Sequence, residues 1–531
     1  MTATATVPQD SPPAPGPTPQ AFRANRTDRS ILAGVFALYA IGFVIWWPSA
    51  VAVTDEAEYV RQASAYAVGE THRVVRDPWT GGERTMVAGS YPLGTAALQA
   101  PFVRIGGWRA AALASVFGLG VLLWAVARLL EDAGRSPLYA LIALGYPPAL
   151  VLGRIAMSDV PGAALVAVGL WAFWRGQFGV RGVPVAHPGR WLFGAGLALG
   201  SSVLLRETIV LVFAPFAIGA VVRYGRQWHA ARVRPRTPIL ALVAGFSLAA
   251  TARLVAWGLV FGHVFYVRYT PVFDVSGLWQ QGPLYLFALL VLVPGGLLAV
   301  LLYKGPLRVE MTVATLGSLL FFAMYEYSGA QSGMVRQLVL GPRYFLPLLP
   351  LLILAIADLG ARIAPRLPAS LPLRPLRWGW IAAMAAVALG VHPVVEAQNR
   401  SNGQLTAALH SHTREGSAVI TNVSATAKQF DGIYGNRTLV GAPFAVSRIG
   451  ILLQKNDGVQ IAVIERTNSA FFQELTASMR LWVAAAAKGC RLSPQVDVQV
   501  TPAERVLVWE VLDCDAPPTA GAAVGAGVPV P

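Results

Sequence analysis

Long apolar runs recur through the first three-quarters of the chain and constrain its fold more than any other feature. A membrane-spanning helix needs roughly 20 mostly apolar residues. About eleven such runs begin near residues 31, 110, 137, 160, 191, 208, 238, 283, 311, 344 and 378. The runs near Tyr146 and Arg206 are interrupted by residues that are costly in lipid, so we expect these segments to line a cavity or to bend at its edge. The sequence therefore predicts a polytopic α-helical membrane protein.

The rest of the chain predicts flexible tails and one soluble unit. We expect a disordered cytoplasmic tail at 1–30, a transmembrane region at 31–395 with a large outer loop at 51–107, an extracytoplasmic α/β domain at 396–514 and a disordered tail at 515–531. Strand-like segments at 418–421 and 459–464, followed by an amphipathic run at 469–488, indicate the α/β domain. The tail at 515–531 is rich in Pro, Gly and Ala, which is typical of disorder.

The distribution of basic residues predicts the orientation. They gather in alternate loops between the apolar runs, and short cytoplasmic loops are enriched in Lys and Arg. This places the N-terminus inside, and an odd number of spans then places the C-terminal domain outside. The formal net charge of +15 follows from these loops, and no basic tract with interleaved aromatic residues suggests nucleic-acid binding. We expect a multi-pass protein of the cell (plasma) membrane, surrounded by membrane lipids.

The two cysteines, Cys490 and Cys514, permit at most one disulfide and no cysteine-rich metal site. If residues 501–504 form a hairpin turn, Val500 faces Arg505. Cys490 then lies within one residue of the position opposite Cys514, which suits a disulfide. An oxidising outer compartment would permit that bond.

Three carboxylates follow directly after the first apolar run. One interpretation is structural: Thr54 caps a helix, and the acids in its first turn complement the helix dipole. The other is catalytic: Asp55 acts as a general base, and Glu56 is a second candidate. Glu58 and Tyr59 then line the substrate cavity from the same helix.

Arg154 and Asp159 lie at a predicted outer junction between two spans. They could form a pair within the loop, with Asp159 capping the next helix and Pro161 in its first turn. The alternative is functional: an ionisable residue at membrane depth is by default a functional hypothesis, which makes Asp159 a candidate catalytic residue. No metal cluster is evident, so we expect no cofactor, although Asp55 and Asp159 could together hold a lone divalent cation.

Several arginines on the predicted outer side break the positive-inside pattern, among them Arg206, Arg268 and Arg343. Each needs a counter-charge. A carboxylate such as Glu207 would serve structurally. A lipid phosphate would serve functionally, because a guanidinium can donate two parallel hydrogen bonds to phosphate oxygens. We therefore expect these three arginines and Arg154 to bind a donor phosphate.

The order of these features resembles the GT-C glycosyltransferases, the group that includes the protein O-mannosyltransferases and the bacterial aminoarabinose transferase. The resemblance covers about residues 30–395. The matching pieces are Asp55-Glu56 after the first span, the stretch that begins with Tyr91-Pro92, the Arg154 to Asp159 junction, and Arg343-Tyr344 at the start of a late span. The C-terminal α/β domain lies outside the resemblance.

The resemblance implies an inverting hexosyl or pentosyl transferase that moves a sugar from a polyprenyl-phosphate donor to an extracytoplasmic glycan, lipid or protein acceptor. Asp55 would take the acceptor proton, and the arginines would stabilise the leaving phosphate. The substrate cavity would be lined by Glu58, Tyr59, Tyr91, Glu207 and Tyr344. Two alternatives remain: a transporter or flippase of lipid-linked substrates, and a receptor or assembly scaffold that works through its outer domain.

Overall fold

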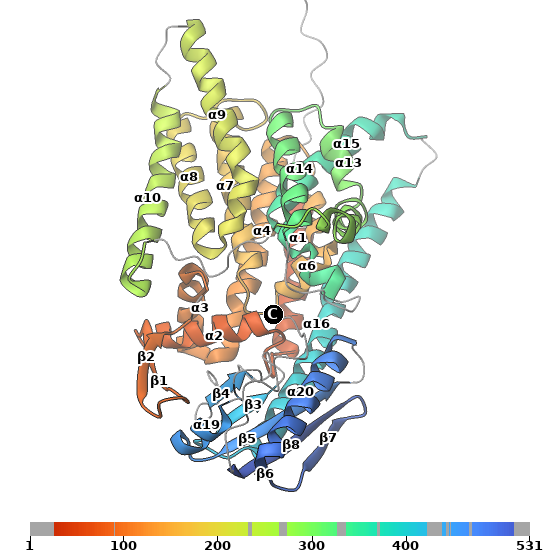
Figure 1. Cartoon of the computed structure of the whole chain (residues 1–531). Coiled ribbons are helices and arrows are strands. Elements are labelled where there is room, and N and C mark those ends of the chain that lie inside the picture. Colours follow the sequence, from red (N-terminus) through yellow and green to blue (C-terminus); the bar gives the residue numbers. More distant parts are fainter. Residues whose placement is uncertain are drawn as a thin grey trace, which may run out of the picture.

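The computed structural model describes residues 26–89, 91–231, 236–264, 273–325, 336–368, 372–421, 438–441, 445, 448–466 and 470–514. A long helical bundle forms one end of the molecule, and a six-stranded sheet lies beneath it at the other end (Figure 1). The expected tails at 1–25 and 515–531 lie outside the described residues.

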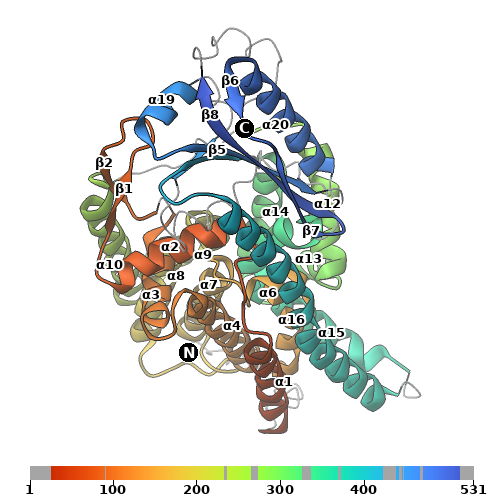
Figure 2. The same ribbon diagram turned by 90° about the horizontal axis from the view of Figure 1, so that it is seen from below.

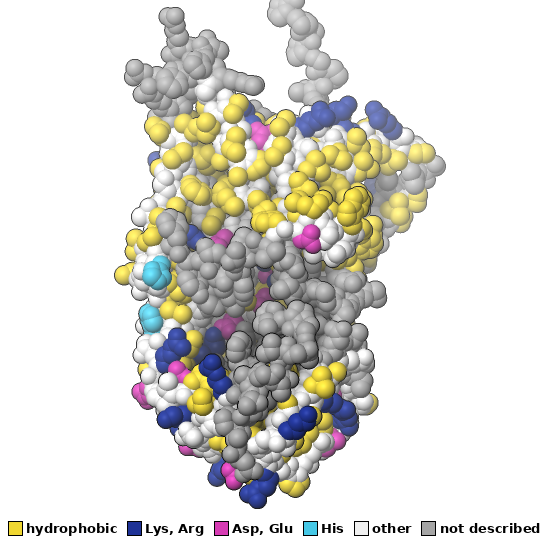
Figure 3. All heavy atoms as spheres, viewed as in Figure 1, with side chains coloured by type: hydrophobic (Ala, Val, Ile, Leu, Met, Phe, Trp, Pro, Cys, Tyr) yellow, Lys and Arg dark blue, Asp and Glu magenta, His cyan; other side chains and the backbone are white. Residues whose placement is uncertain are grey.

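Six described helical segments are long and apolar enough to cross a membrane. They consist of α1 (Arg26–Ile45), η1 with α4 (Trp108–Ala112, Leu113–Asp132), η3 with α9 (Glu207–Ile209, Val210–Ala231), α10 (Arg236–Phe261), η6 with α15 (Pro342–Leu348, Leu349–Ile363) and α16 (Leu373–His412). Hydrophobic side chains cover the helical end of the molecule, whereas charged side chains gather around the sheet (Figure 3). The chain is therefore a multi-pass membrane protein.

The other five expected runs are also helical. Helices α7 (Asp159–Phe178) and α8 (Pro188–Leu205) are unbroken, and α14 (Arg308–Met324) has 17 residues. Two runs are broken into η2 (Pro137–Leu141), α5 (Ile142–Gly145) and α6 (Pro147–Leu152), and into α11 (Gly277–Gln280), α12 (Gly282–Phe287), η4 (Ala288–Leu292) and α13 (Gly296–Leu301). The expected bend at Tyr146 is present, because Pro147 disfavours a helical backbone in the preceding residue.

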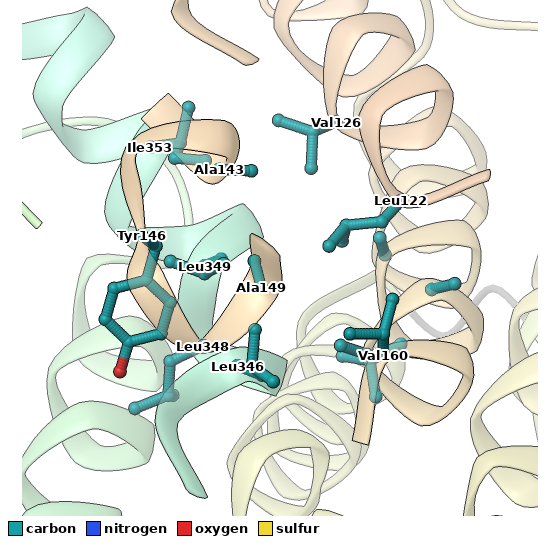
Figure 4. Close-up of a cluster of buried hydrophobic side chains, with 14 of the residues drawn as sticks. Leu122, Val126, Ala143, Tyr146, Ala149, Val160, Leu346, Leu348, Leu349 and Ile353 are labelled. Carbon is teal, nitrogen blue, oxygen red and sulfur yellow. The ribbon is translucent and has the colours of Figure 1, made fainter. Parts of the chain in front are cut away.

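Close packing holds the bundle together. Leu122 and Val126 of α4 and Val160 of α7 face α6 and α15, where Ala149 and Leu349 complete a buried cluster (Figure 4). Helix association in lipid depends on van der Waals packing and small residues, because lipid tails are as apolar as the side chains themselves. The close packing of the side chains in this buried cluster therefore stabilises the bundle.

Helices α8 and α10 meet through two glycines. A Cβ on Gly196 would lie 2.0 Å from the carbonyl oxygen of Leu242, and one on Gly245 would lie 2.1 Å from that of Phe193. Neither backbone could approach so closely if a side chain were present. Helix α8, held close to α10 in this way, ends at Leu205, and the next residue, Arg206, belongs to the site described below.

The C-terminal sheet has the strand order β4-β3-β5-β8-β6, and β7 also pairs with β8. Its elements are β3 (Ala418–Thr421), β4 (Thr438–Gly441), α19 (Ile449–Lys455), β5 (Val459–Arg466), α20 (Ala470–Gly489), β6 (Cys490–Leu492), β7 (Val496–Thr501) and β8 (Glu504–Cys514). The end of α16 packs on one face through Leu405 and Leu409, and α20 contributes Met479 to the core of the other face. Viewed from below, one end of α16 reaches the strands of the sheet, and the rest of the helix runs away from it (Figure 2). The expected strands and helix are present close to their predicted limits.

A disulfide joins Cys490 to Cys514, which face each other in the β6–β8 pair. The β7–β8 hairpin turns where the sequence predicts, but Gln499 rather than Val500 faces Arg505. The expected pairing is wrong by one residue because β7 contains a bulge, which adds an unmatched residue to one strand.

The loop at 51–107 folds into α2 (Thr54–Ala67), a β1–β2 hairpin (His72–Arg76, Glu83–Val87) and α3 (Leu93–Gly106). Helix α2 lies between the bundle and the sheet (Figure 1). The hairpin contacts the turn before β5, where Arg76 Nη1 lies 3.2 Å from Asp457 Oδ2 and Asn456 Nδ2 donates to the Pro78 carbonyl at 2.9 Å. The loop therefore links the bundle to the C-terminal domain.

Candidate active site

The start of α2 brings the acidic turn to the junction of bundle and sheet. The helix begins at Thr54, and the extended residue Val53 is its N-cap with no side-chain capping bond. The expected Thr54 cap is therefore wrong. A capping residue precedes the first helical residue, whereas Thr54 is itself the first residue of α2. Asp55 and Glu56 lie in the first turn, as expected.

Asp55 is bound on both of its oxygens. The Tyr91 hydroxyl donates a hydrogen bond to Asp55 Oδ1, and Arg343 Nη2 donates to Oδ2 at 3.4 Å. The Asp55 side chain is 29% exposed, whereas that of Arg343 is only 6% exposed. Asp55 is therefore a carboxylate that a substrate can reach.

Asp159 is the buried partner of the same arginine. Its side chain is 1% exposed, its Oδ1 accepts a hydrogen bond from Arg206 Nη1, and Arg343 Nε lies 3.9 Å from that oxygen. Within the described part of the chain, no donor reaches Asp159 Oδ2. The expected capping role is wrong, because Ser158 is the N-cap and Asp159 is already the first residue of α7.

We call Asp55, Asp159, Arg206 and Arg343 the carboxylate–arginine cluster. Two carboxylates face two guanidinium groups, so their charges can balance. The ring of Tyr344 adds a cation–π contact, with its centre 4.7 Å from the Arg206 guanidinium and 5.5 Å from that of Arg343. Helix α8 ends just before Arg206, and the backbone of Arg206 is extended. The sequence predicts this interruption of the helix, which directs the Arg206 side chain toward the cluster.

Two tyrosines support the cluster from α2 and the following loop. The Tyr59 hydroxyl donates to Ser158 Oγ at 3.0 Å, and the rings of Tyr59 and Tyr91 pack with their centres 4.6 Å apart. Burial raises the pKa of Tyr59, so its hydroxyl stays protonated and acts as a donor. The predicted cavity residues Tyr59, Tyr91 and Tyr344 are thus brought together.

Glu56 has a different environment from Asp55. It is 4% exposed, and its two oxygens accept hydrogen bonds from the backbone N–H groups of Ala52 at 2.6 Å and Ala156 at 2.8 Å. Burial raises its pKa to about 7, although the two hydrogen bonds oppose the shift. Glu56 therefore ties the start of α2 to the segment before α7 and holds Asp55 near Asp159.

Arg154 lies inside the protein instead of facing the cluster. It is completely buried and donates to the carbonyl oxygens of Trp46 and His392, each at 2.7 Å, and to Glu396 Oε2 at 3.2 Å. The expected pair with Asp159 is wrong, because Glu396 in α16 takes that place. We assign Arg154 a structural role and not the expected role in phosphate binding.

Sequence reasoning did not single out His392 or Glu396, the two α16 side chains that bind Arg154. A signal was available: both are ionisable residues in or beside the last apolar run, and such residues are rare without a partner or a function. Applying that rule to every run would have identified them.

Two predicted cavity acids bind arginines outside the cluster. Glu58 pairs with Arg61 on the same helix, and Glu207 pairs with Arg253 of α10 instead of Arg206. Arg268 lies outside the described residues.

The described residues contain no group of three or more His, Cys, Asp or Glu side chains arranged to hold a metal ion. A lone divalent cation between Asp55 and Asp159 would meet Arg343, whose side chain lies beside both carboxylates. That positive charge opposes a cation and favours an anion at the same position.

Comparison with protein-family models and with curated proteins gives no match. Among solved structures, the fold is similar to that of ArnT from Cupriavidus metallidurans. In the apo state ArnT matches with a TM-score of 0.50 and 15% identity, over 91% of this chain and 98% of that chain. Bound to undecaprenyl phosphate it matches with a TM-score of 0.52 and 16% identity, over 90% and 98%. Such coverage takes in the C-terminal sheet as well as the bundle.

Proposed function

We propose that this chain, which shares the GT-C fold with ArnT, transfers a sugar from a polyprenyl-phosphate donor to an acceptor outside the cytoplasm. The observation that carries the proposal is the carboxylate–arginine cluster, in which the accessible Asp55 contacts Arg343 and the buried Asp159 holds Arg206. ArnT has been solved with undecaprenyl phosphate bound, which supports a lipid of that class as the donor carrier here.

In this proposal Asp55 is the general base. It accepts the proton of an acceptor hydroxyl or amine as the acceptor heteroatom forms a bond to the anomeric carbon. The bond from that carbon to the phosphate oxygen breaks, and its electron pair stays on the phosphate. Attack from the side opposite the leaving group inverts the carbon. Asp55 is preferred over Asp159 because it is 29% exposed, whereas Asp159 is 1% exposed.

The arginines would stabilise the leaving group. A polyprenyl phosphate has a second pKa of about 6, so it can depart near neutral pH without a general acid. Arg206 and Arg343 provide fixed positive charge where the negative charge grows, which is the usual source of the largest rate enhancement. Tyr344 lies against both guanidinium groups and would hold them in place.

The orientation is part of the proposal. The loops that carry most basic residues lie between apolar runs on the predicted cytoplasmic side, and basic side chains occur at the rim of the bundle opposite the sheet (Figure 3). The sheet and α2 would then lie outside the cytoplasm, on the outer side of the plasma membrane. The Cys490–Cys514 disulfide supports this placement, because disulfides persist in oxidising compartments.

The test is sugar transfer from a radiolabelled polyprenyl-phosphate sugar in vesicles that contain the purified protein, with a lipid extract as acceptor. We expect Asp55→Asn to lower kcat by about 10²- to 10⁴-fold. The matched control is Asp457→Asn, an exposed carboxylate in the sheet domain that should leave kcat unchanged. Equal rates for wild type and Asp55→Asn would refute the base assignment. Movement of intact donor across the membrane without sugar release would favour a flippase.

A further inference from the structure

Arg343 lies between the two aspartates of the cluster, and its two contacts differ. Its Nε is 3.9 Å from the buried Asp159, and its Nη2 is 3.4 Å from the accessible Asp55. A charge-assisted hydrogen bond is usually about 2.7–2.9 Å long, so the Asp55 contact is a loose one. An anion that reaches Arg343 could form a closer contact with its guanidinium group and so displace Asp55.

We propose that Asp55 and the donor phosphate compete for Arg343, so that donor binding releases the base. This inference rests on the proposed function and adds an order of events to it. Before the donor binds, Arg343 holds Asp55 as an ion pair and lowers its tendency to accept a proton. When the phosphate takes Arg343, Asp55 keeps the Tyr91 hydrogen bond but loses the contact with Arg343, and it becomes a stronger base.

The charge balance of the cluster supports the exchange. Two carboxylates and two guanidinium groups are neutral together, so a donor phosphodiester with one negative charge creates an excess. During transfer the acceptor proton passes to Asp55, while the leaving phosphate gains about the charge that Asp55 loses. The total charge is therefore conserved during transfer, and Arg343 stays with the phosphate that it took when the donor bound.

Arg206 would not exchange in the same way. Its partner Asp159 is 1% exposed, and its guanidinium also lies over the Tyr344 ring. A phosphate would therefore meet Arg206 as a fixed donor that is already oriented. The competition is confined to the Asp55–Arg343 pair, which makes it open to a direct test.

The experiment measures binding of two probes to the full chain in nanodiscs: a polyprenyl monophosphate and its methyl phosphodiester, which keeps a single charge at every pH used. The variants are wild type, Asp55→Asn, Arg343→Gln and the Asp55→Asn/Arg343→Gln double variant, with Asp457→Asn as the exposed control. We expect Asp55→Asn to bind both probes about tenfold more tightly than wild type, because Asp55 then no longer competes with the phosphate for Arg343 Nη2. In the Arg343→Gln background the same change should have little effect.

Proton uptake provides a second measurement that does not depend on the Arg343 variant being folded. Binding of the phosphodiester probe to wild type should take up protons from solution, because the probe draws Arg343 away from Asp55 and adds a negative charge beside it. Asp55→Asn should take up fewer protons at the same pH. Equal or weaker binding by Asp55→Asn, or equal proton uptake, would overturn the competition while leaving the proposed function standing. If folded wild type binds neither probe and turns over no donor, the proposed function itself fails.

Discussion

Replacing Arg154 should lower the stability of the folded protein and should not abolish its binding of a lipid phosphate. Arg154 is completely buried and Glu396 is 4% exposed, so Arg154→Met leaves a buried carboxylate near Asn399 and the exposed Arg400. It also removes the donor to two carbonyl oxygens, those of Trp46 and His392. Breaking a buried ion pair from one side typically costs about 3–5 kcal/mol.

The double variant Arg154→Met/Glu396→Met separates the ion pair from the buried charge that its loss leaves behind. Once both charges are gone, no unpaired ion is buried, so part of the lost stability should return. The matched control is Arg76→Met. Its pair with Asp457 is 42% and 65% exposed and should contribute about 0–1 kcal/mol.

The assay is the unfolding midpoint of the purified protein in nanodiscs, together with polyprenyl phosphate binding measured well below that midpoint. We expect Arg154→Met to lower the midpoint strongly, Arg76→Met to leave it nearly unchanged, and the double variant to lie between them. Binding per folded molecule should stay near wild type in all three. An Arg154→Met protein with a normal midpoint and no phosphate binding would show that Arg154 is a phosphate ligand and that the structural assignment is wrong.

Four further outcomes follow from the same contacts. Burial raises the pKa of Glu56 to about 7, above its value of about 4.3 in an unfolded chain, so its contribution to stability is complete below pH 4.3 and is lost as the pH rises through 7. Glu56→Gln should flatten the pH dependence of the unfolding midpoint across that window. Tyr91→Phe removes the hydrogen bond to Asp55 Oδ1 and should lower kcat about tenfold with little change in the midpoint. Gly196→Leu should separate α8 from α10 and lower both folded yield and activity, because its Cβ would lie 2.0 Å from a backbone oxygen. Reduction of the disulfide, or Cys514→Ser, should destabilise the C-terminal domain by about 3 kcal/mol, read as a lower midpoint with reductant in wild type only.

The sequence predicted those features that depend on local composition. The apolar runs became helices, and Pro147 broke one of them at Tyr146, because both effects act over a few residues. Strand β3 occupies residues 418–421 as expected, because a short apolar run bounded by turn residues usually forms a strand. A one-residue bulge in β7 was not predictable in this way, because it depends on how the hairpin fits the rest of the sheet.

Ion-pair partners were the main failure, because pairing depends on three-dimensional proximity and not on separation in sequence. Asp159 was matched with Arg154, five positions away, but it binds Arg206 and approaches Arg343. Arg154 itself binds Glu396, 242 residues further along the chain. The residue types and their predicted side of the membrane limited the candidates, but only the packing of α7, α8 and α16 selects the pairs.

Burial gives the two aspartates of the cluster different tasks. An aspartate that must take a proton from an incoming acceptor has to be reached by it, and Asp55 has the exposure for that while Asp159 does not. A buried carboxylate, in contrast, is costly unless it holds a cation firmly, and Asp159 does so with Arg206. Replacing Asp159 by Asn should therefore release Arg206 and weaken phosphate binding, whereas the same change at Asp55 should strengthen it. These opposite effects of one chemical substitution would follow from the different burial of the two aspartates and from the arginine that each one holds.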